Sequence, residues 1–544
     1  MGRSLWGAVL ACCGLAGEAL GQPEERAGEP SKEPGPAPAA EEPARPSAEP
    51  VAPPQPALPS PAQPAAQEPP PRAVEPPSAG EKPAAAADKK RRTSAPTGFF
   101  FGSYGRVVAA SDGRGRPGRD ADIVAHGSRL DHSNYVELEL RRDDYWEPAD
   151  ASTRFVSTLA IGNPIFHYAG DFDTSLAVRN LYLEERDLGA QGLSLWVGSR
   201  LLRGDDIYLF DFWPLDNLNT MGGGLRFDQP VAPPQGQQFQ RFVTGLSVHM
   251  GLAQPGNPFY RQEAARPAPL NQFGAATVAV LDRQRWVGSL RGEEHFKLSP
   301  VAGIKAVLYG EAHHVPSAQR ESQVAGVFEE LPVERGFAVG AEVGGYSGER
   351  DTHLNLFVRY ARGLAAYGEF ASPSGLGLDR STADAHELVL ALSGNGELGP
   401  VAVMAAAYFR SFRNASSELD FEDIDEGIVM ARPQLFLGDW AGVAVEGSYQ
   451  LQERGVLLAR DSERAELEPQ LAGITRVGVM PFVCPRGPGS FSRPMFYLAY
   501  VASFRDAGAR ALYPKDDPFS LHEVEHFMGM GAEWWFGSTS YGGP

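Results

Sequence analysis

Short segments of alternating apolar and polar residues recur from Thr97 to the end of this 544-residue chain. Clear examples are YVELEL at 135–140, HELVLAL at 386–392 and FYLAYVASF at 496–504. Alternation with a period of two is typical of a strand with one apolar and one polar face. A stretch of about 440 residues is too long for one soluble β-sandwich, but it suits a barrel of roughly 16 to 18 strands. The pattern therefore predicts an all-β fold, a transmembrane antiparallel β-barrel.

The connections between these segments differ in length. Tight turns are predicted at Gly394–Gly396 and at Gly438–Asp439, and a long polar connection is predicted at Arg410–Glu426. Short turns at one end and long loops at the other are the outer-membrane pattern. The mean hydropathy of −0.27 fits a barrel, because its alternating strands never sum to an apolar run. The net charge of −19 argues against a nucleic-acid partner.

The first 21 residues have the composition of a secretory signal peptide. An apolar core at Leu5–Leu15 precedes the small-x-small site Ala19–Gly21. The alternative is a lipoprotein signal that ends at Cys12 or Cys13. A cleaved signal predicts export from the cytoplasm.

Residues 22–96 are rich in Pro, Ala and Glu and contain almost no aromatic residues. Such a segment cannot bury a core, which predicts a disordered periplasmic linker between the signal and the barrel domain at 97–544. It ends in the basic run Lys89–Arg92. This run is either the solvated end of a linker or a contact with acidic cell-wall polymer, which would make peptidoglycan a partner.

The alternation is interrupted by a stretch that is both charged and aromatic. It contains Arg203, Asp205, Asp206, Asp211 and Asp216 among Tyr208, Phe210, Phe212 and Trp213. A soluble core would not hold so many charges unless each one were paired. A loop folded into a watery lumen would pack its rings on the wall and turn its charges toward the channel. We therefore predict a constriction loop inside the barrel.

Several motifs around this stretch resemble one family. They are RNLYL at 179–183, WVGSR at 196–200, the aspartates that precede Trp213, and the glycines Gly222–Gly224. This region is similar to the third-loop region of the maltoporin (carbohydrate porin) family, and the resemblance extends over roughly Phe99–Phe536. It implies 18 strands, a homotrimer in outer-membrane lipid, and passive, sugar-selective diffusion of maltose or malto-oligosaccharides. It implies neither an enzyme nor a cofactor.

Four predicted strands each place an aromatic residue on the same face as a charged one. Tyr104 shares a face with Arg106, Tyr135 with Glu137, Phe357 with Arg359, and Trp535 with Glu533. Lipid-facing positions should be apolar, so these rings are predicted to face the lumen. A sugar ring offers an apolar face that rings can cover and hydroxyls that charges can bind. The alternative is that the rings only fill space in the barrel.

The resemblance assigns roles to these residues. Tyr104 and Arg106 match the family's first-strand tyrosine and arginine, and Tyr135 and Glu137 match its second-strand Tyr-x-Glu. Phe357 and Trp535 match two further rings of its aromatic slide, and its polar track is matched by Arg129, Arg179, Arg203, Asp206 and Asp211. Trp213 falls where the family often has a constriction tyrosine. Phe172 is the candidate for the ring that the family donates to a neighbouring subunit. These residues form the predicted sugar site.

One other motif suggests different chemistry. HEVEH at 522–526 fits the zinc-protease pattern H-E-x-x-H, but that chemistry needs a helix to bring both histidines to one face. Here the motif leads into the last predicted strand, so no metal is expected. Three alternatives to a sugar channel stay open: a general or ion-selective porin without sugar preference, a wall-tethered structural barrel, and an outer-membrane enzyme.

Overall fold

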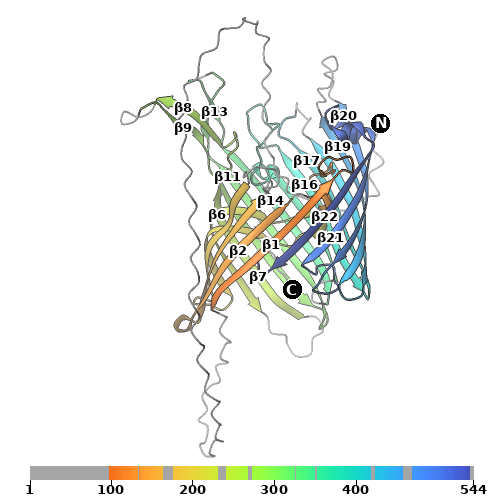
Figure 1. Ribbon diagram of the computed structural model, residues 1–544. Helices are drawn as coiled ribbons and strands as arrows, with labels where there is room; N and C mark the ends of the chain where they lie inside the picture. Colours follow the sequence, from red (N-terminus) through yellow and green to blue (C-terminus); the bar gives the residue numbers. More distant parts are fainter. Residues whose placement is uncertain are drawn as a thin grey trace, which may run out of the picture. The chain divides into compact units, whose positions relative to one another are not determined.

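The computed structural model describes residues 97–132, 134–162, 175–230, 240–267, 273–324, 326–348, 352–417, 423–456 and 468–539. Eighteen strands form one antiparallel sheet (Figure 1). β1 pairs with both β2 and the last strand, β22, which closes the sheet into a barrel. The predicted barrel and the 18 strands implied by the family resemblance are confirmed. The predicted signal at 1–21 and linker at 22–96 lie outside the described residues.

The barrel strands are β1 (Gly98–Ser111), β2 (Tyr135–Trp146), β3 (Ala151–Gly162), β4 (Ser175–Arg186), β5 (Leu193–Arg203), β6 (Asn217–Pro230), β7 (Gln240–Ala253), β10 (Arg285–Lys297), β11 (Ala302–Val315), β14 (Glu334–Ser347), β15 (Thr352–Gly363), β16 (His386–Leu398), β17 (Val401–Arg413), β18 (Ile424–Leu437), β19 (Ala441–Val456), β20 (Glu468–Val483), β21 (Met495–Arg505) and β22 (Val524–Phe536).

Smaller elements occupy the long connections at one end of the barrel. They are the hairpin of β8 (Arg261–Pro267) and β9 (Ala275–Asp282), the hairpin of β12 (Ala318–Glu321) and β13 (Phe328–Leu331), and the short helices α1 (Ala507–Ala511) and α2 (Pro518–Leu521). The β8–β9 hairpin projects beyond the strand ends (Figure 1). Among the described residues, no helix combines the length and the apolar character needed to cross a membrane.

Connection length separates the two ends of the barrel, as predicted. Residues 147–150 and 438–440 are short turns at one end, whereas 112–134 and 364–385 are long loops at the other. The predicted turn at Gly438–Asp439 is confirmed.

Two predicted connections need correction. The predicted turn at Gly394–Gly396 is wrong, because these residues lie inside β16 and pair with β17. The chain turns at Gly399–Pro400 instead, where Gly399 has a φ of 60° and proline has no N–H for the ladder. The predicted long connection Arg410–Glu426 is shorter than expected, because β17 runs to Arg413 and β18 begins at Ile424.

Alternation sorts the side chains between lipid and lumen. On β2, Leu138 and Leu140 are 39% and 47% exposed, whereas Glu137 and Glu139 are 1% exposed. On β22, Met530 is exposed and Glu533 is buried. The apolar residues therefore form the outer surface that a bilayer requires, and the charged residues point inward.

A hydrophobic cluster lies inside the barrel. The connection 204–216, between β5 and β6, contributes Ile207, Phe210 and Phe212, which are at most 1% exposed. Phe357 of β15 and Tyr408 of β17 belong to the same cluster. The predicted inward-folded constriction loop is therefore present.

Candidate functional site

The constriction loop (residues 204–216) is held by local backbone bonds and by its rings. The N–H of Ile207 donates to the carbonyl of Phe212 at 2.6 Å, and Tyr208–Phe210 form one turn of 3-10 helix. The ring of Phe210 packs edge-on against Tyr408, with centroids 6.0 Å apart. The aromatic side of the loop is thereby fixed to the lumen wall, as expected from its sequence.

The charged side of the loop is bound by arginines. The carboxylate of Asp211 accepts hydrogen bonds from Arg106 at 3.2 Å and from Arg129 at 3.1 Å. Burial alone would raise the pKa of Asp211, but the two guanidinium groups outweigh it and hold this pKa well below its usual range. At Asp206, burial prevails and raises the pKa to about 6, against the opposing effect of Arg129. Asp211 is therefore ionised at neutral pH, whereas the carboxyl of Asp206 titrates near pH 6.

Arg129 connects the loop to the first and last strands. Its guanidinium donates to the phenol oxygen of Tyr104 at 2.7 Å and to Glu533 at 2.5 Å. It also lies over the ring of Tyr208, with 4.4 Å from the guanidinium carbon to the ring centroid. Predicted site residues that are distant in sequence therefore meet at the tip of the constriction loop.

A second group of predicted residues lies on β2 and β4. Arg179 donates to both the phenol of Tyr135 and the carboxylate of Glu137. The rings of Tyr135 and Tyr104 are 6.0 Å apart, which brings this group next to the first one. Together they line one stretch of the inner wall.

The other predicted residues have different surroundings. Phe357 is buried in the cluster under the constriction loop, and Trp535 meets Tyr208 edge-on at 6.0 Å. Arg203 donates to Asn217 at 2.7 Å and lies over the ring of Trp213 at 3.6 Å. Arg203 and Trp213 therefore contact each other beside the entry to the constriction loop. Phe172 lies outside the described residues.

Sequence reasoning missed the turn 484–494 between β20 and β21. Its Arg493 is buried, donates to Glu533 at 2.8 Å and to the phenol of Tyr208, and covers the ring of Trp535 at 4.4 Å. Phe491 of the same turn packs edge-on against Tyr208 at 5.6 Å. The available signal was the length of this turn at an end where most connections are shorter, and length alone does not indicate that a turn folds inward.

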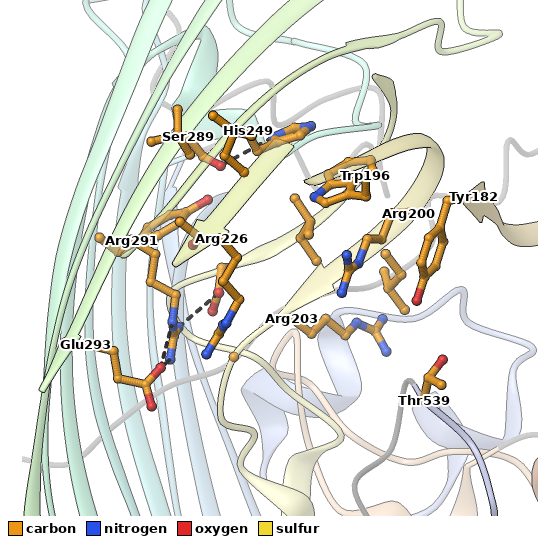
Figure 2. Close-up of a pocket in the computed structure, with 18 of the residues that line it drawn as sticks. Tyr182, Trp196, Arg200, Arg203, Arg226, His249, Ser289, Arg291, Glu293 and Thr539 are labelled. Atoms are coloured by element: carbon orange, nitrogen blue, oxygen red, sulfur yellow. Dashed lines mark hydrogen bonds and ion pairs between the residues drawn. The ribbon is translucent and has the colours of Figure 1, made fainter. Parts of the chain in front are cut away.

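Sequence reasoning also missed a cavity of about 320 Å³ on the side of the constriction loop that faces β4–β7 and β10 (Figure 2). Its walls include Tyr182, Trp196 and His249, together with arginines from β5, β6 and β10. Of the predicted site residues that the structure describes, Arg203 alone lines it. Two features of the sequence could have indicated this cavity. Trp196 alternates with the apolar residues of β5 and so faces the lumen, and several arginines share the lumen face with it.

Two groups have residue types that bind metals. The motif at 522–526 does not lie on a helix: His522 follows α2 and β22 begins at Val524, so the zinc-protease geometry is not formed. Asp120, Asp122 and His132 have ligand atoms within 4.8 Å of one another. Because Arg476 already pairs with Asp122, this second group does not present a free acidic cluster.

Comparison with known proteins gives weak structural similarities. OmpT, an outer membrane protein of Vibrio cholerae, matches at 11% identity and a TM-score of 0.32, covering 81% of this chain and 97% of that one. Wzi, an outer membrane protein involved in capsule assembly in Escherichia coli, matches at 10% identity and a TM-score of 0.34, covering 79% of this chain and 83% of that one. OmpF of Salmonella typhi, in complex with daunomycin, matches at 10% identity and a TM-score of 0.34, covering 81% of this chain and 98% of that one. These scores are too low to carry an argument, and no curated protein sequence matches significantly.

The family comparison is more informative, because it covers the first strands and the constriction loop. Residues 99–228 match the model of the LamB porin family. This region contains β1 to β5, the loop at 204–216 and most of β6. Together with the closed 18-stranded barrel, the match supports a maltoporin-like outer-membrane porin family for this chain.

Proposed function

We propose that this porin conducts carbohydrates of the maltose or malto-oligosaccharide kind passively down their gradient. One observation carries the proposal: predicted residues from β1, β2, β4 and the constriction loop lie together, and they belong to the region that matches the LamB porin family. Tyr104 and Tyr135 supply neighbouring rings, and Arg106, Glu137 and Arg179 supply charged groups beside them.

The selectivity follows from complementary chemistry. A pyranose has an apolar C–H face, which stacks on a ring and displaces water from both surfaces. Its hydroxyls donate to carboxylates and accept from guanidinium groups. Sites that are weak and similar to one another let a sugar move from one to the next without being trapped.

Sugar must compete with contacts that the protein makes with itself. Tyr104 is 2% exposed and Phe357 is 5% exposed, so neither ring offers a free face while the constriction loop is in place. Binding at these two positions therefore needs a displacement of the loop, and we expect low affinity. The same burial favours the second candidate function, a general porin whose inner rings only pack the loop.

Other parts of the proposal extend beyond the barrel. We propose a secretory signal at 1–21, a periplasmic linker at 22–96 whose basic end contacts peptidoglycan, and a homotrimer of barrels at 97–544. In that trimer, Phe172 is the ring that one subunit would donate to its neighbour. Crosslinking between subunits of the membrane-embedded protein tests the trimer. Crosslinking to peptidoglycan, with and without residues 22–96, tests the linker.

The function is tested by liposome swelling. Vesicles with the purified protein are placed in isotonic glucose, maltose, maltotriose or raffinose, and the initial swelling rates are compared. A sugar-selective channel admits maltotriose faster than raffinose, although both are trisaccharides. Rates that depend on molecular size alone would instead establish the general porin.

A further inference from the structure

The cavity beside the constriction loop differs in chemistry from the predicted sugar track. Four arginines and three carboxylates line it: Arg200, Arg203, Arg226 and Arg291, with Asp205, Asp216 and Glu293. The formal excess is therefore one positive charge, inside a chain whose net charge is −19. Its volume of about 320 Å³ is near the lower end of ligand pockets, roughly 300–1,000 Å³. A ligand of one or two rings suits this space better than a long chain.

The carboxylates of the cavity are already engaged by the protein. Asp216 and Glu293 accept from the same guanidinium, that of Arg291, at 2.9 and 3.2 Å. Asp205 pairs with the buried ammonium of Lys305. Because these acceptors are committed, they compete poorly for the hydroxyl hydrogens of a ligand.

Two arginines of the cavity keep donor capacity. Arg200 donates to Glu184 at 2.9 Å and Arg226 donates to Asp228 at 2.6 Å, whereas a guanidinium carries five N–H groups. Figure 2 shows the guanidinium groups of Arg200, Arg203 and Arg226 around one space. The carboxylate partners of Arg200 and Arg226 are Glu184 and Asp228, which lie outside the cavity lining. From there they hold the two guanidinium groups in place. Such fixed guanidinium groups are preorganised for an oxyanion.

The aromatic wall of the cavity does not offer a surface for stacking. The rings of Trp196 and His249 are stacked on each other, with centroids 5.6 Å apart and an angle of 10°. The guanidinium of Arg200 covers both Tyr182 and Trp196. Trp196 and Tyr182 are 4% and 5% exposed, so they support the arginines rather than receive a sugar ring. Recognition here depends on hydrogen-bond donors.

We infer that this cavity binds the carboxylate or phosphate group of an acidic sugar of one or two rings. The inference rests on the proposed carbohydrate function and extends its substrate class to anionic sugars. The oxyanion would accept from Arg200 and Arg226, while the ring would occupy the remaining volume between β4 and β10. The neutral sugars of the predicted track would not need this cavity.

The test measures single-channel current in a planar bilayer while glucuronate, glucose 6-phosphate or glucose is added. Arg226→Gln removes one guanidinium at a position that is partly exposed, where folding should tolerate the change. Arg142→Gln is the matched control, because Arg142 pairs with the acid two residues along its own strand, as Arg226 does, and does not line the cavity. Arg142→Gln should keep the KCl conductance of the parent protein.

We expect glucuronate and glucose 6-phosphate to block the parent channel at about tenfold lower concentration than glucose. Arg226→Gln should remove this preference and Arg142→Gln should retain it. Equal block by acidic and neutral sugars, or an unchanged preference in Arg226→Gln, would overturn the inference. Inorganic phosphate is included as an anion without a sugar ring. If phosphate blocks the current at the same concentration as glucuronate, the inference is also overturned.

The outcomes separate this inference from the proposed function. If maltotriose blocks the current but glucuronate has no advantage over glucose, the cavity assignment fails and the neutral sugar track stands. If glucuronate blocks with the expected dependence on Arg226 but no neutral sugar blocks, the cavity assignment stands and the neutral track fails.

Discussion

Arg493 holds the tip of the constriction loop from the turn 484–494. It is 3% exposed, and its guanidinium donates to Glu533 at 2.8 Å, donates to the phenol of Tyr208 and covers the ring of Trp535 at 4.4 Å. Arg493→Ala deletes all three contacts. Glu533 keeps Arg129 at 2.5 Å and the Tyr208 hydroxyl at 2.7 Å, so its charge is only partly uncompensated.

The cost can be bounded from these contacts. Loss of a hydrogen bond to a charged group costs about 1.5–3 kcal/mol, and loss of a buried cation–π contact adds about 1 kcal/mol. We therefore expect the free energy of unfolding to fall by about 2–4 kcal/mol, below the roughly 3–5 kcal/mol for a buried charge left without a partner. Since the phenol of Tyr208 loses Arg493 and keeps Glu533, the tip of the loop should be held less firmly, and the open-channel current should also become noisier.

Equilibrium unfolding in urea, measured in lipid by tryptophan fluorescence, gives the free energy, and bilayer recording gives the noise. Arg142→Ala is the control, because its pair with Asp144 is partly exposed and should contribute about 0–1 kcal/mol. If Arg493→Ala loses no more stability than Arg142→Ala, the turn 484–494 does not hold the loop.

Three further predictions concern single residues. Because the pKa of Asp206 is raised to about 6, the carboxyl gains its negative charge as the pH rises from 5 to 7. Cation selectivity from reversal potentials should therefore rise over this range, and it should rise less in Asp206→Asn. Gly198 has a φ of 134°, and a Cβ there would lie 2.2 Å from the carbonyl oxygen of Leu181. Gly198→Ala should therefore lower the free energy of unfolding in urea by about 1–3 kcal/mol. Gly345→Ala is the control and should cost little, because a Cβ at Gly345 would meet open space. Tyr135→Ala should raise the maltotriose concentration for half-block about fivefold, whereas Tyr135→Phe keeps the ring and should change it less than about twofold.

The barrel could be predicted because a bilayer imposes a simple rule on each strand. Lipid admits only apolar side chains on the outer face, so the parity of Leu138 against Glu137, or of Met530 against Glu533, is visible in the sequence. The constriction loop could be predicted for a similar reason, because its charges and rings fit neither a soluble core nor a lipid face. The turns could not all be predicted, since a sequence such as Gly394–Gly396 is compatible with both a turn and a strand interior.

The contacts inside the lumen could not be predicted in the same way. Arg493 and Tyr208 are 285 residues apart, and neither alternation nor composition says where the tip of a loop will end. The predicted groups around Tyr104 and Tyr135 did come together, because β1 and β2 are neighbours and Tyr104 lies opposite Glu137 in their register. The cavity near Trp196 depends on the path of the loop across β5, which only the folded chain defines.

The central claim is that sugars move through this channel by binding weakly inside it, and single-channel recording tests it most directly. The current through the protein in a planar bilayer is measured while malto-oligosaccharides of increasing length are titrated, with sucrose as the control. The account predicts a saturable block that strengthens with chain length and weakens in Tyr135→Ala. A current that stays unchanged under every sugar would contradict the account and leave a general porin.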